Sequence, residues 1–333
     1  MKGKLVVSLL ILSLTTLLLA LLSPEPAETI VRFFTGPFRN IYAFGSFLSS
    51  ALLLVIAGTG ISICFRGGQF NLGGEGQVYS GAAASLTAAL LLPLMPGFIA
   101  KPLLIAAAMI TGFLIAALSG WLRHRFSIHE LISSYLTSGA LVFFCDFLIS
   151  GPLRDEESFL IATQRIPGAY TLAQLLPPSP LHSGIFIAAA VAAASHIFLH
   201  RSVWGYRLRM FGEQSTFARF GGISPRTYRI MPIGISGALY GLAGAVALLG
   251  IHYRGIQGFT AGLGWNGIAV ALIAGTSPVM TLYAALLVAY IEIGISSAMA
   301  GAAVTYDLGL IVRGAILIVV TLKVLKRKQE ELL

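Results

Sequence analysis

The sequence predicts an all-α protein that crosses a membrane about ten times, in spans of roughly 20 residues each. Three observations lead to this fold class. First, 56% of the 333 residues are hydrophobic and only 11% are charged, whereas soluble domains carry about 25% charged residues. Second, the apolar residues are gathered into runs of span length. Third, basic residues collect between these runs, as the positive-inside rule predicts.

The first apolar run, residues 5–22, follows Lys2 and Lys4. A cleaved signal peptide is one interpretation, but the apolar core of a signal is usually about 7–15 residues long. We therefore expect a retained first span. In order along the chain, the expected spans are 5–22, 43–64, 78–95, 102–120, 131–150, 183–199, 230–250, 263–276, 279–299 and 308–323.

The eighth of these segments is short. Gly275 and Pro278 interrupt what would otherwise be one long apolar run, and a single helix of that length would overshoot a hydrocarbon core of about 30 Å. Because proline ends a helix, we expect a break and a tight turn here. A re-entrant segment at 263–276 is the alternative.

Basic residues test this layout when the N-terminus is placed in the cytoplasm and the spans alternate. Most of them then fall inside, in agreement with the positive-inside rule. Those inside are Lys2, Lys4, Arg66, Arg123, Arg125, Arg201, Arg207, Arg209, Arg219, Arg226, Arg229, Lys323, Lys326, Arg327 and Lys328. Those outside are Arg32, Arg39, Lys101, Arg154, Arg165 and Arg254. Both termini are therefore expected in the cytoplasm.

The longest outer segment, residues 151–182, carries an acidic run, Asp155–Glu157, and the proline-rich sequence LLPPSP. Its expected place on the external face makes it accessible to a binding partner. A plain solvated loop is an equally good interpretation.

Two glycine-rich stretches look related. Residues 65–77 read FRGGQFNLGGEGQ, and residues 253–267 read YRGIQGFTAGLGWNG. Both open with an aromatic residue, Arg, Gly, any residue and Gln, and both contain an aromatic–Asn pair. In the layout above they start on opposite sides of the membrane, which is the pattern of an inverted repeat whose interrupted helices meet near the midplane. Coincidence is the alternative, because the chain has 37 glycines.

The first of these stretches has more glycine than helix packing requires, and it also carries polar side chains: Gln69, Asn71, Glu75 and Gln77. Glycine lets the backbone turn or approach a neighbour closely. Non-helical backbone at membrane depth is tolerated only where it is buried in protein or lines a water-filled cavity. We interpret 66–77 as an element that lines or gates a pathway, with an ordinary cytoplasmic turn as the alternative.

Ionisable residues inside a membrane are expensive and are functional candidates by default. Glu292, within LLVAYIEIGISSAM, is the clearest one. Asp146 lies near the end of a span and is expected at the interface.

Residues 201–224 form a basic segment in an otherwise apolar chain. Arginines stand at Arg201, Arg207, Arg209, Arg219 and, just beyond, Arg226, with small residues between them. An apolar chain has little use for such a loop unless another protein docks on it.

Catalytic and cofactor signals are missing. The sequence contains no GxxxxGK[ST] phosphate loop, no HExxH and no GxSxG, so we expect neither a catalytic site nor a metal or cofactor site, and any ATP hydrolysis would belong to another chain. Cys64 and Cys145 lie in apolar runs and are interpreted as small buried hydrophobes. The net charge of +9 does not indicate nucleic acid, because basic patches with stacking aromatics are missing.

Three motifs give a family resemblance. FNLGGEGQVYSGA at 70–82 is similar to FNIGxEGQ, GEQSTFARFGGIS at 212–224 with SGALYGLAGA at 236–245 is similar to GENxxAARYAGI and SGxLAGLAGA, and GLGWNGIAVALIAGTSP at 262–278 is similar to GxGFDGIAVALLGxxxP. The chain resembles the permease subunits of binding-protein-dependent ABC importers, in the group that handles ribose and other simple sugars, nucleosides and branched-chain amino acids. The nucleoside and simple-sugar branch is the most similar.

The resemblance implies a single transmembrane permease domain over 1–333, with a cytoplasmic coupling loop at 201–229 that docks on an ATPase. The residues that match the coupling motif are Gly212, Glu213, Ala218, Arg219 and Gly222. The expected substrate path comprises Phe70, Asn71, Gly73, Gly74, Glu75, Gln77, Trp265, Asn266 and Gly267. One departure concerns the cargo, since relatives often carry Asp where this chain has Asn266.

The expected partners are cytoplasmic ATP-binding subunits, a second permease chain (identical or paralogous) and an external solute-binding protein, in the bacterial cytoplasmic membrane. Few fixed charges lie in the expected path, which suits a neutral polar cargo: a nucleoside first, then a simple sugar, then riboflavin. A secondary transporter or channel that needs no ATPase is the alternative, with Glu292 as its candidate for ion coupling. An intramembrane enzyme is disfavoured because no nucleophile–base pair or metal-ligand set is apparent.

Overall fold

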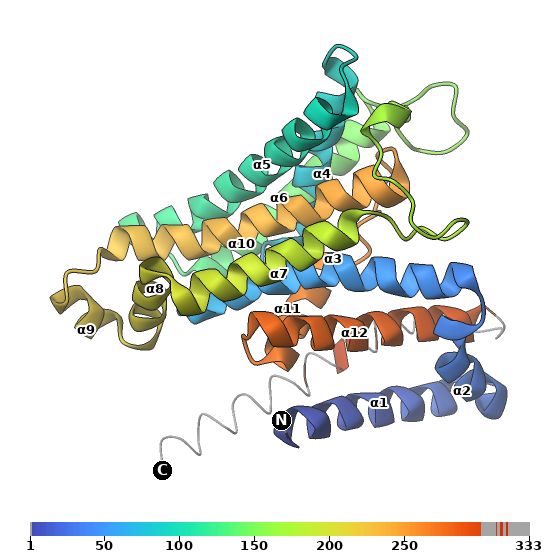
Figure 1. The fold of residues 1–333 in the computed structure, drawn as a ribbon, viewed down its shortest axis with the longest axis horizontal. Helices are drawn as coiled ribbons and strands as arrows, with labels where there is room; N and C mark the ends of the chain where they lie inside the picture. Colours follow the sequence, from blue (N-terminus) through green and yellow to red (C-terminus); the bar gives the residue numbers. More distant parts are fainter. Residues whose placement is uncertain (1, 301–310, 312–313, 316–317, 319–333) are drawn as a thin grey trace.

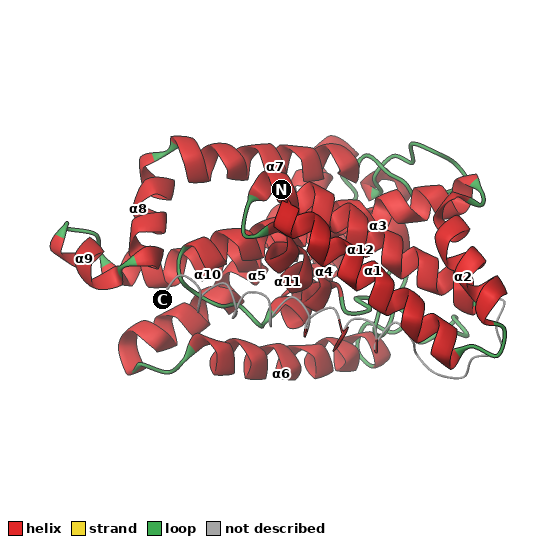
Figure 2. Cartoon of the chain, turned by 90° about the horizontal axis from the view of Figure 1, so that it is seen from below, coloured by secondary structure: helices red, strands yellow, loops and turns green. Residues whose placement is uncertain are grey.

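The computed structural model describes residues 2–300 together with 311, 314, 315 and 318 (Figure 1). Within this part of the chain every regular element is a helix (Figure 2), accompanied by three isolated β-bridges. The helices are α1 (Lys2–Leu22), α2 (Pro26–Thr35), η1 (Gly36–Phe38), α3 (Ile41–Arg66), α4 (Gly74–Leu91), α5 (Gly97–Phe126), α6 (Glu130–Ser150), η2 (Gly168–Tyr170), α7 (Gly184–Arg201), α8 (Val203–Glu213), α9 (Ser215–Phe220), α10 (Pro225–Ala247), the π-helical η3 (Leu248–His252), α11 (Leu263–Ala274) and α12 (Pro278–Met299).

The all-α class is confirmed for the described residues, and nine of the ten expected spans coincide with helices. Six helices are long and apolar enough to cross a membrane: α3, α5, α6, α7, α10 continued by η3, and α12. The apolar parts of α1 and α11 are shorter. The chain is therefore a multi-pass membrane protein with six candidate spans in its described part. The tenth expected span, 308–323, and the basic tail from Lys323 lie outside the described residues apart from positions 311, 314, 315 and 318.

The sequence did not predict α2. This short helix has the sequence PAETIVRFFT and buries only Thr29 and Phe33. Its remaining residues are mixed polar and apolar, so a search for long apolar runs passes over it. It follows α1 at the end of the molecule opposite α8 and α9 (Figure 1).

Two helices form the centre of the bundle. The most apolar windows of α3 and α10 are each 89% buried within the chain, against 28% for α6 and 22% for α7. The outward faces of α6 and α7 therefore contact lipid or another chain, while α3 and α10 make up the core.

The crossing of α5 and α10 depends on small residues. A Cβ on Gly237 would overlap the carbonyl oxygen of Gly112, a Cβ on Gly112 would overlap that of Gly237, and a Cβ on Gly241 would overlap that of Ala108. Small residues let helix backbones approach closely in a membrane. These glycines are therefore packing residues.

The predicted break between the eighth and ninth segments is present. α11 ends with Gly275 at φ +62°, Thr276 follows at φ +57°, and Pro278 opens α12. Left-handed backbone suits glycine, and proline fits the first turn of a helix because its missing N–H is not needed there.

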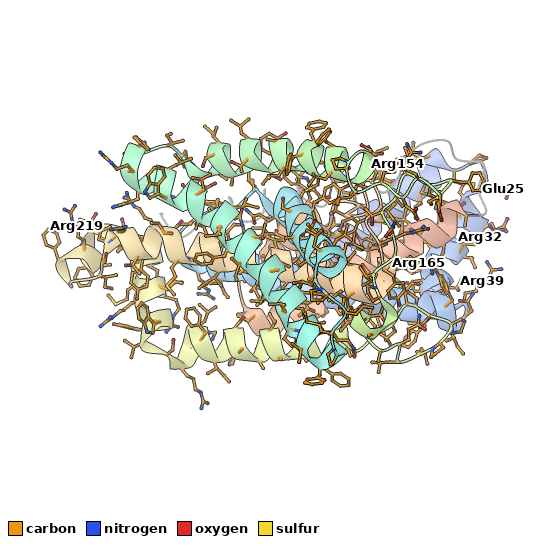
Figure 3. All side chains as sticks on the ribbon, turned by 90° about the horizontal axis from the view of Figure 1, so that it is seen from above. Glu25, Arg32, Arg39, Arg154, Arg165 and Arg219 are labelled. Atoms are coloured by element: carbon orange, nitrogen blue, oxygen red, sulfur yellow. The ribbon has the colours of Figure 1, made fainter. Side chains whose placement is uncertain are left out.

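Several exposed arginines lie at the two ends of the bundle. Figure 3 shows Arg219 at one end, and Arg32, Arg39, Arg154 and Arg165 with Glu25 at the other. This separation agrees with the predicted division of these arginines between the two sides of the membrane.

A substitution at Gly237 can test the close crossing of α5 and α10. Gly237→Val should lower the melting temperature of the detergent-solubilised protein, because overpacking a filled site costs about 1–3 kcal/mol or more. Gly139→Val on α6 is the control, since a Cβ there meets no atom within 4 Å. Equal melting temperatures for the two variants, measured by the intrinsic fluorescence of the protein, would contradict the packing role.

Candidate functional site

The candidate site lies where two helix breaks meet. The first break, residues 67–73, separates α3 from α4, and the second break, residues 253–262, separates η3 from α11. α4 and α11 both begin at this point, and a Cβ on Gly264 would overlap the backbone nitrogen of Glu75. The two stretches that look related in sequence are therefore in contact.

The Glu75 side chain joins the two helix starts. Its Oε1 accepts a hydrogen bond from the backbone N–H of Gly262 at 3.0 Å, and its Oε2 accepts one from that of Gly264 at 2.9 Å. The first N–H groups of a helix have no partner within the helix, and a negative charge is stabilising at that end. A residue in the first turn of α4 thus caps α11.

Asn71 holds the first break together. It is fully buried, and its side-chain oxygen accepts hydrogen bonds from the N–H of Gly73 at 2.9 Å and from Gln77 Nε2 at 3.0 Å. Its Nδ2 donates to Gln77 Oε1 at 2.8 Å and to Ser236 Oγ of α10 at 3.1 Å. In this conformation both amides bond to protein groups and fix the shape of the break.

The glycines expected in the path are closely surrounded. A Cβ on Gly73 would lie 2.5 Å from Gln77 Nε2, and a Cβ on Gly74 would lie 2.5 Å from the Tyr240 ring. A Cβ on Gly267 would lie 2.9 Å from Ala57 Cβ. These positions hold glycine because neighbouring groups occupy the space that a side chain would need.

Asn266 is linked to the intramembrane acid that the sequence singled out. Asn266 Nδ2 donates to Glu292 Oε1, and Ser50 Oγ donates to Glu292 Oε2 at 2.6 Å. Asn266 is only 3% exposed. Glu292 therefore connects α12 to α11 and α3.

Aromatic rings border the two breaks. Phe70 is 45% exposed and packs against Phe65, with ring centroids 5.0 Å apart. Trp265 meets Tyr135 of α6 edge to face at 6.1 Å. Phe259 of the second break contacts Tyr79 at 5.3 Å.

A polar stripe on α6 supports the first break, and the sequence analysis missed it. Glu130, Ser134 and Ser138 stand four residues apart, so they share one helix face. They accept hydrogen bonds from the backbone N–H groups of the 70–76 segment, namely Phe70 to Glu130 at 3.3 Å, Leu72 to Ser134 at 3.1 Å and Gly76 to Ser138 at 2.8 Å. The regular spacing of polar residues in ELISSYLTS was the signal that could have revealed them.

Two further polar contacts fasten α6 along its length. Glu130 is fully buried and forms an ion pair with Arg123 at the end of α5. Asp146, expected at the interface, accepts a hydrogen bond from Tyr79 of α4, and the Tyr79 oxygen also accepts one from the N–H of Gly258 at 3.2 Å. α6 thus contacts the first break near one end and the second break near the other.

The basic loop rests directly on the first break. A Cβ on Gly212 of α8 would overlap the carbonyl oxygen of Arg66, and a Cβ on Gly68 would overlap the Gly212 backbone. Gln69 Nε2 donates to the carbonyl oxygen of Tyr228 at 2.5 Å. Two glycines therefore allow main chain to meet main chain between the loop and the break.

The residues expected to couple to an ATPase take different positions. Ala218 is 1% exposed and faces inward, while Glu213 and Arg219 are exposed. Gly222 has φ +78°, follows the end of α9, and has open space around it. Phe217 and Phe220 of α9 are 64% and 89% exposed. They stand in the stretch Phe217–Phe220, where the sequence departs from the AARYA of the family motif.

The segment 151–182, expected on the external face, is attached to the second break. Thr163 N–H donates to the carbonyl oxygen of Gly255 at 3.0 Å, and Ile166 N–H donates to that of Tyr253 at 2.9 Å. His182 is fully buried beside Gly184 and Gly250, and this burial lowers its pKa to about 4. The ring is therefore neutral at physiological pH and acts as a packing group.

The described residues contain no group of three or more His, Cys, Asp or Glu side chains that is placed to hold a metal ion. The polar groups named above instead bond to backbone N–H groups and to one another. The chemistry of the site is therefore that of hydrogen bonding and helix ends.

Substitutions can test whether the serines of the α6 stripe hold the first break. In the double variant Ser134→Ala/Ser138→Ala, the N–H groups of Leu72 and Gly76 lose their acceptors. Each buried N–H group left without an acceptor should destabilise the break by about 1–3 kcal/mol. Hydrogen exchange at these two amides should become at least tenfold faster. Ser133→Ala is the control, because Ser133 Oγ donates only to carbonyls of its own helix turn. Unchanged exchange in the double variant would show that the stripe does not hold the break.

Comparisons with known proteins agree with this arrangement. The guanosine ABC transporter permease protein NupP of Bacillus subtilis is 31% identical over 265 residues, covering 78% of this chain and 75% of the relative. The protein named "Probable riboflavin import permease protein RfuC" of Treponema pallidum is 30% identical over 306 residues, covering 91% and 80%. The glucose ABC transporter permease protein TsgB13 of Haloferax volcanii is 26% identical, covering 84% and 76%.

The family description "Branched-chain amino acid transport system / permease component" matches residues 43–321, most of the chain and both breaks. This match decides against the alternative of a secondary transporter or channel. The chain belongs to this family and is a permease component of an ABC importer.

Proposed function

We propose that this chain pairs with a second permease chain and with separate ATP-hydrolysing subunits, and that it moves a small, neutral, polar solute into the cell. The contact between α8 and the first break carries the proposal. A loop that docks an ATPase has no direct contact with a solute, so its movement must reach the path through the protein. The backbone contact between Gly212 and Gly68 provides that connection.

The connection continues through residues already described. α9 presents Phe217 and Phe220 to a partner. The preceding helix, α8, contacts the first break through Gly212. The break leads into α4, where Glu75 caps the start of α11. Closely packed contacts of this kind switch between discrete arrangements and do not deform continuously. A displacement of the loop would therefore move both breaks together.

The membrane layout in this proposal has about ten spans with both termini in the cytoplasm, and each span needs roughly 20 residues. α4 and α11 are the interrupted partners of α3 and α10, and their N-termini meet inside the bundle. This arrangement supports an inverted repeat, in which discontinuous helices from two halves form the path. The loop end carries Arg219, and the positive-inside rule assigns it to the cytoplasm.

The chemistry of the breaks favours a neutral cargo. Glu75 and Glu292 are both engaged by donors from the chain itself. Amides and aromatic rings are the other polar and stacking groups near the break. The similar proteins are named for guanosine, riboflavin and glucose, which are neutral at physiological pH. We place a nucleoside first, followed by a simple sugar and riboflavin.

The outer end receives the solute from a binding protein in this proposal. The segment 151–182 lies there and is hydrogen-bonded to the second break. Arg32, Arg39, Arg154 and Arg165 project at the same end (Figure 3). A binding protein docked on 151–182 would therefore act directly on the backbone next to α11.

Substitutions on α9 test the proposed contact with the ATPase. The substitutions Phe220→Asp and Arg219→Glu should reduce solute uptake per ATP hydrolysed by at least tenfold, because they change the exposed side chains that α9 would present to the ATPase. The measurement uses vesicles that contain the complete importer. Arg125→Glu is the control, an exposed arginine at the end of α5 and outside the coupling loop 201–229. Vesicles that contain this chain without an ATPase should accumulate no solute, and uphill uptake there would overturn the proposed function.

Substitutions of Asn266 and Asn71 test the proposed substrate path. Asn266→Leu should raise KM or lower kcat for uptake at least tenfold, because the leucine removes the hydrogen bond to Glu292 and a polar group beside the breaks. Asn71→Leu should do the same, provided that gel filtration shows an assembled complex. Thr35→Leu in α2 is the control, since Thr35 is exposed, lies outside both breaks and donates to the carbonyl oxygen of Val31 in its own helix. Normal uptake kinetics in both asparagine variants would remove these residues from the path.

A further inference from the structure

A cavity at the loop end is lined by converging basic side chains. Its volume is about 450 Å³, and it lies between the end of α5, α9 and the start of α10. His124 comes from α5, Arg219 from α9, and Arg226 and Arg229 from α10. This volume is within the range of ligand pockets, roughly 300–1,000 Å³.

The lining contains no carboxylate. The positive-inside rule explains why arginines are frequent at this end, but it does not explain why three elements direct them into one cavity. Like charges at close range repel each other unless a counter-charge is present. The cavity therefore has a charge pattern that an anion would complete.

Neutral donors are also available in the cavity. Ser215, Thr216 and Ser224 line it with hydroxyl groups. Ser224 precedes α10 but makes no capping hydrogen bond with its side chain, so this 23-residue helix begins beside the cavity without a side-chain cap. Helix N-termini are favourable sites for anions. His124 Nδ1 is buried and has no hydrogen-bond partner among the described residues.

We propose that this cavity binds a phosphate group, carried either by the headgroup of an anionic lipid or by a soluble phosphate compound. Arginine matches the geometry of phosphate, because its planar fork donates two parallel hydrogen bonds. Basic pockets between helices on the cytoplasmic side are suited to such headgroups. The phosphate would connect Arg219 on α9 to the basic residues on α5 and α10.

The bound phosphate would fix the position of α9. This helix has six residues and buries only Ala218, while its Phe217 and Phe220 side chains project outward. An anion between Arg219 and the ends of α5 and α10 would attach α9 to the core. Occupancy of the cavity would then set how firmly the loop transmits a movement.

The test measures binding by this chain alone, purified in a neutral detergent. Inorganic phosphate should raise the melting temperature in a saturable manner, because a ligand of the folded state stabilises it, and chloride at equal ionic strength should not. Arg226→Gln/Arg229→Gln should weaken the apparent affinity for phosphate at least tenfold. Arg201→Gln, an exposed arginine outside the cavity, should leave it unchanged. Arg226→Lys keeps the charge and serves as a second variant if the double variant does not fold.

Nanodiscs distinguish the two sources of phosphate. If a lipid headgroup fills the cavity, added phosphate should stabilise the chain in phosphatidylcholine but not in phosphatidylglycerol. If the natural ligand is soluble, added phosphate should stabilise the chain in both. Equal stabilisation by chloride, or equal phosphate affinity in the wild type and the double variant, would overturn the proposal. These readouts do not depend on transport, so they leave the proposed function untouched.

Discussion

The fold depends on one carboxylate that serves a helix other than its own. Glu75 belongs to the first turn of α4, yet both of its oxygens accept N–H groups at the start of α11. A helix that begins inside a membrane exposes donors that lipid cannot satisfy. A charged acceptor satisfies them and is stabilised by the dipole of the helix that it caps. The place where two helices begin is thereby also the place where they are joined.

The remaining backbone of the first break is satisfied in a similar way. Three N–H groups between Phe70 and Gly76 use side chains of α6, and Asn71 accepts the N–H of Gly73. Backbone without helical bonds survives at membrane depth only under such conditions. The polar residues of this region thus have structural partners in the conformation described. Transport would require some of these bonds to exchange with other partners, which is possible because amides and hydroxyls can both donate and accept.

Much of this could be predicted from the sequence, and the limits have physical causes. Apolar runs identified α3, α5, α6, α7, α10 and α12 because span length and composition are strong signals. Repeated glycine motifs identified the breaks that meet at Glu75. Pairing between distant residues was not predictable. Ser138 accepts a hydrogen bond from Gly76, and Glu292 accepts one from Asn266, only because the fold brings these residues together. Short amphipathic helices such as α2 escaped because their apolar face is only a few residues long.

The shallow packing of α6 has a mechanical consequence. Only 28% of its most apolar window is buried within the chain, so where lipid covers the rest, most of its apolar surface remains in hydrocarbon after a small sliding displacement. Lipid tails are as apolar as leucine, and such a slide therefore changes little hydrophobic free energy. What resists it are the hydrogen bonds that Glu130, Ser134 and Ser138 accept from the 70–76 segment. The Glu130–Arg123 ion pair and the Asp146–Tyr79 hydrogen bond add to this resistance. α6 is therefore held in place by polar contacts along one face, and its opposite, apolar face does not fix its position.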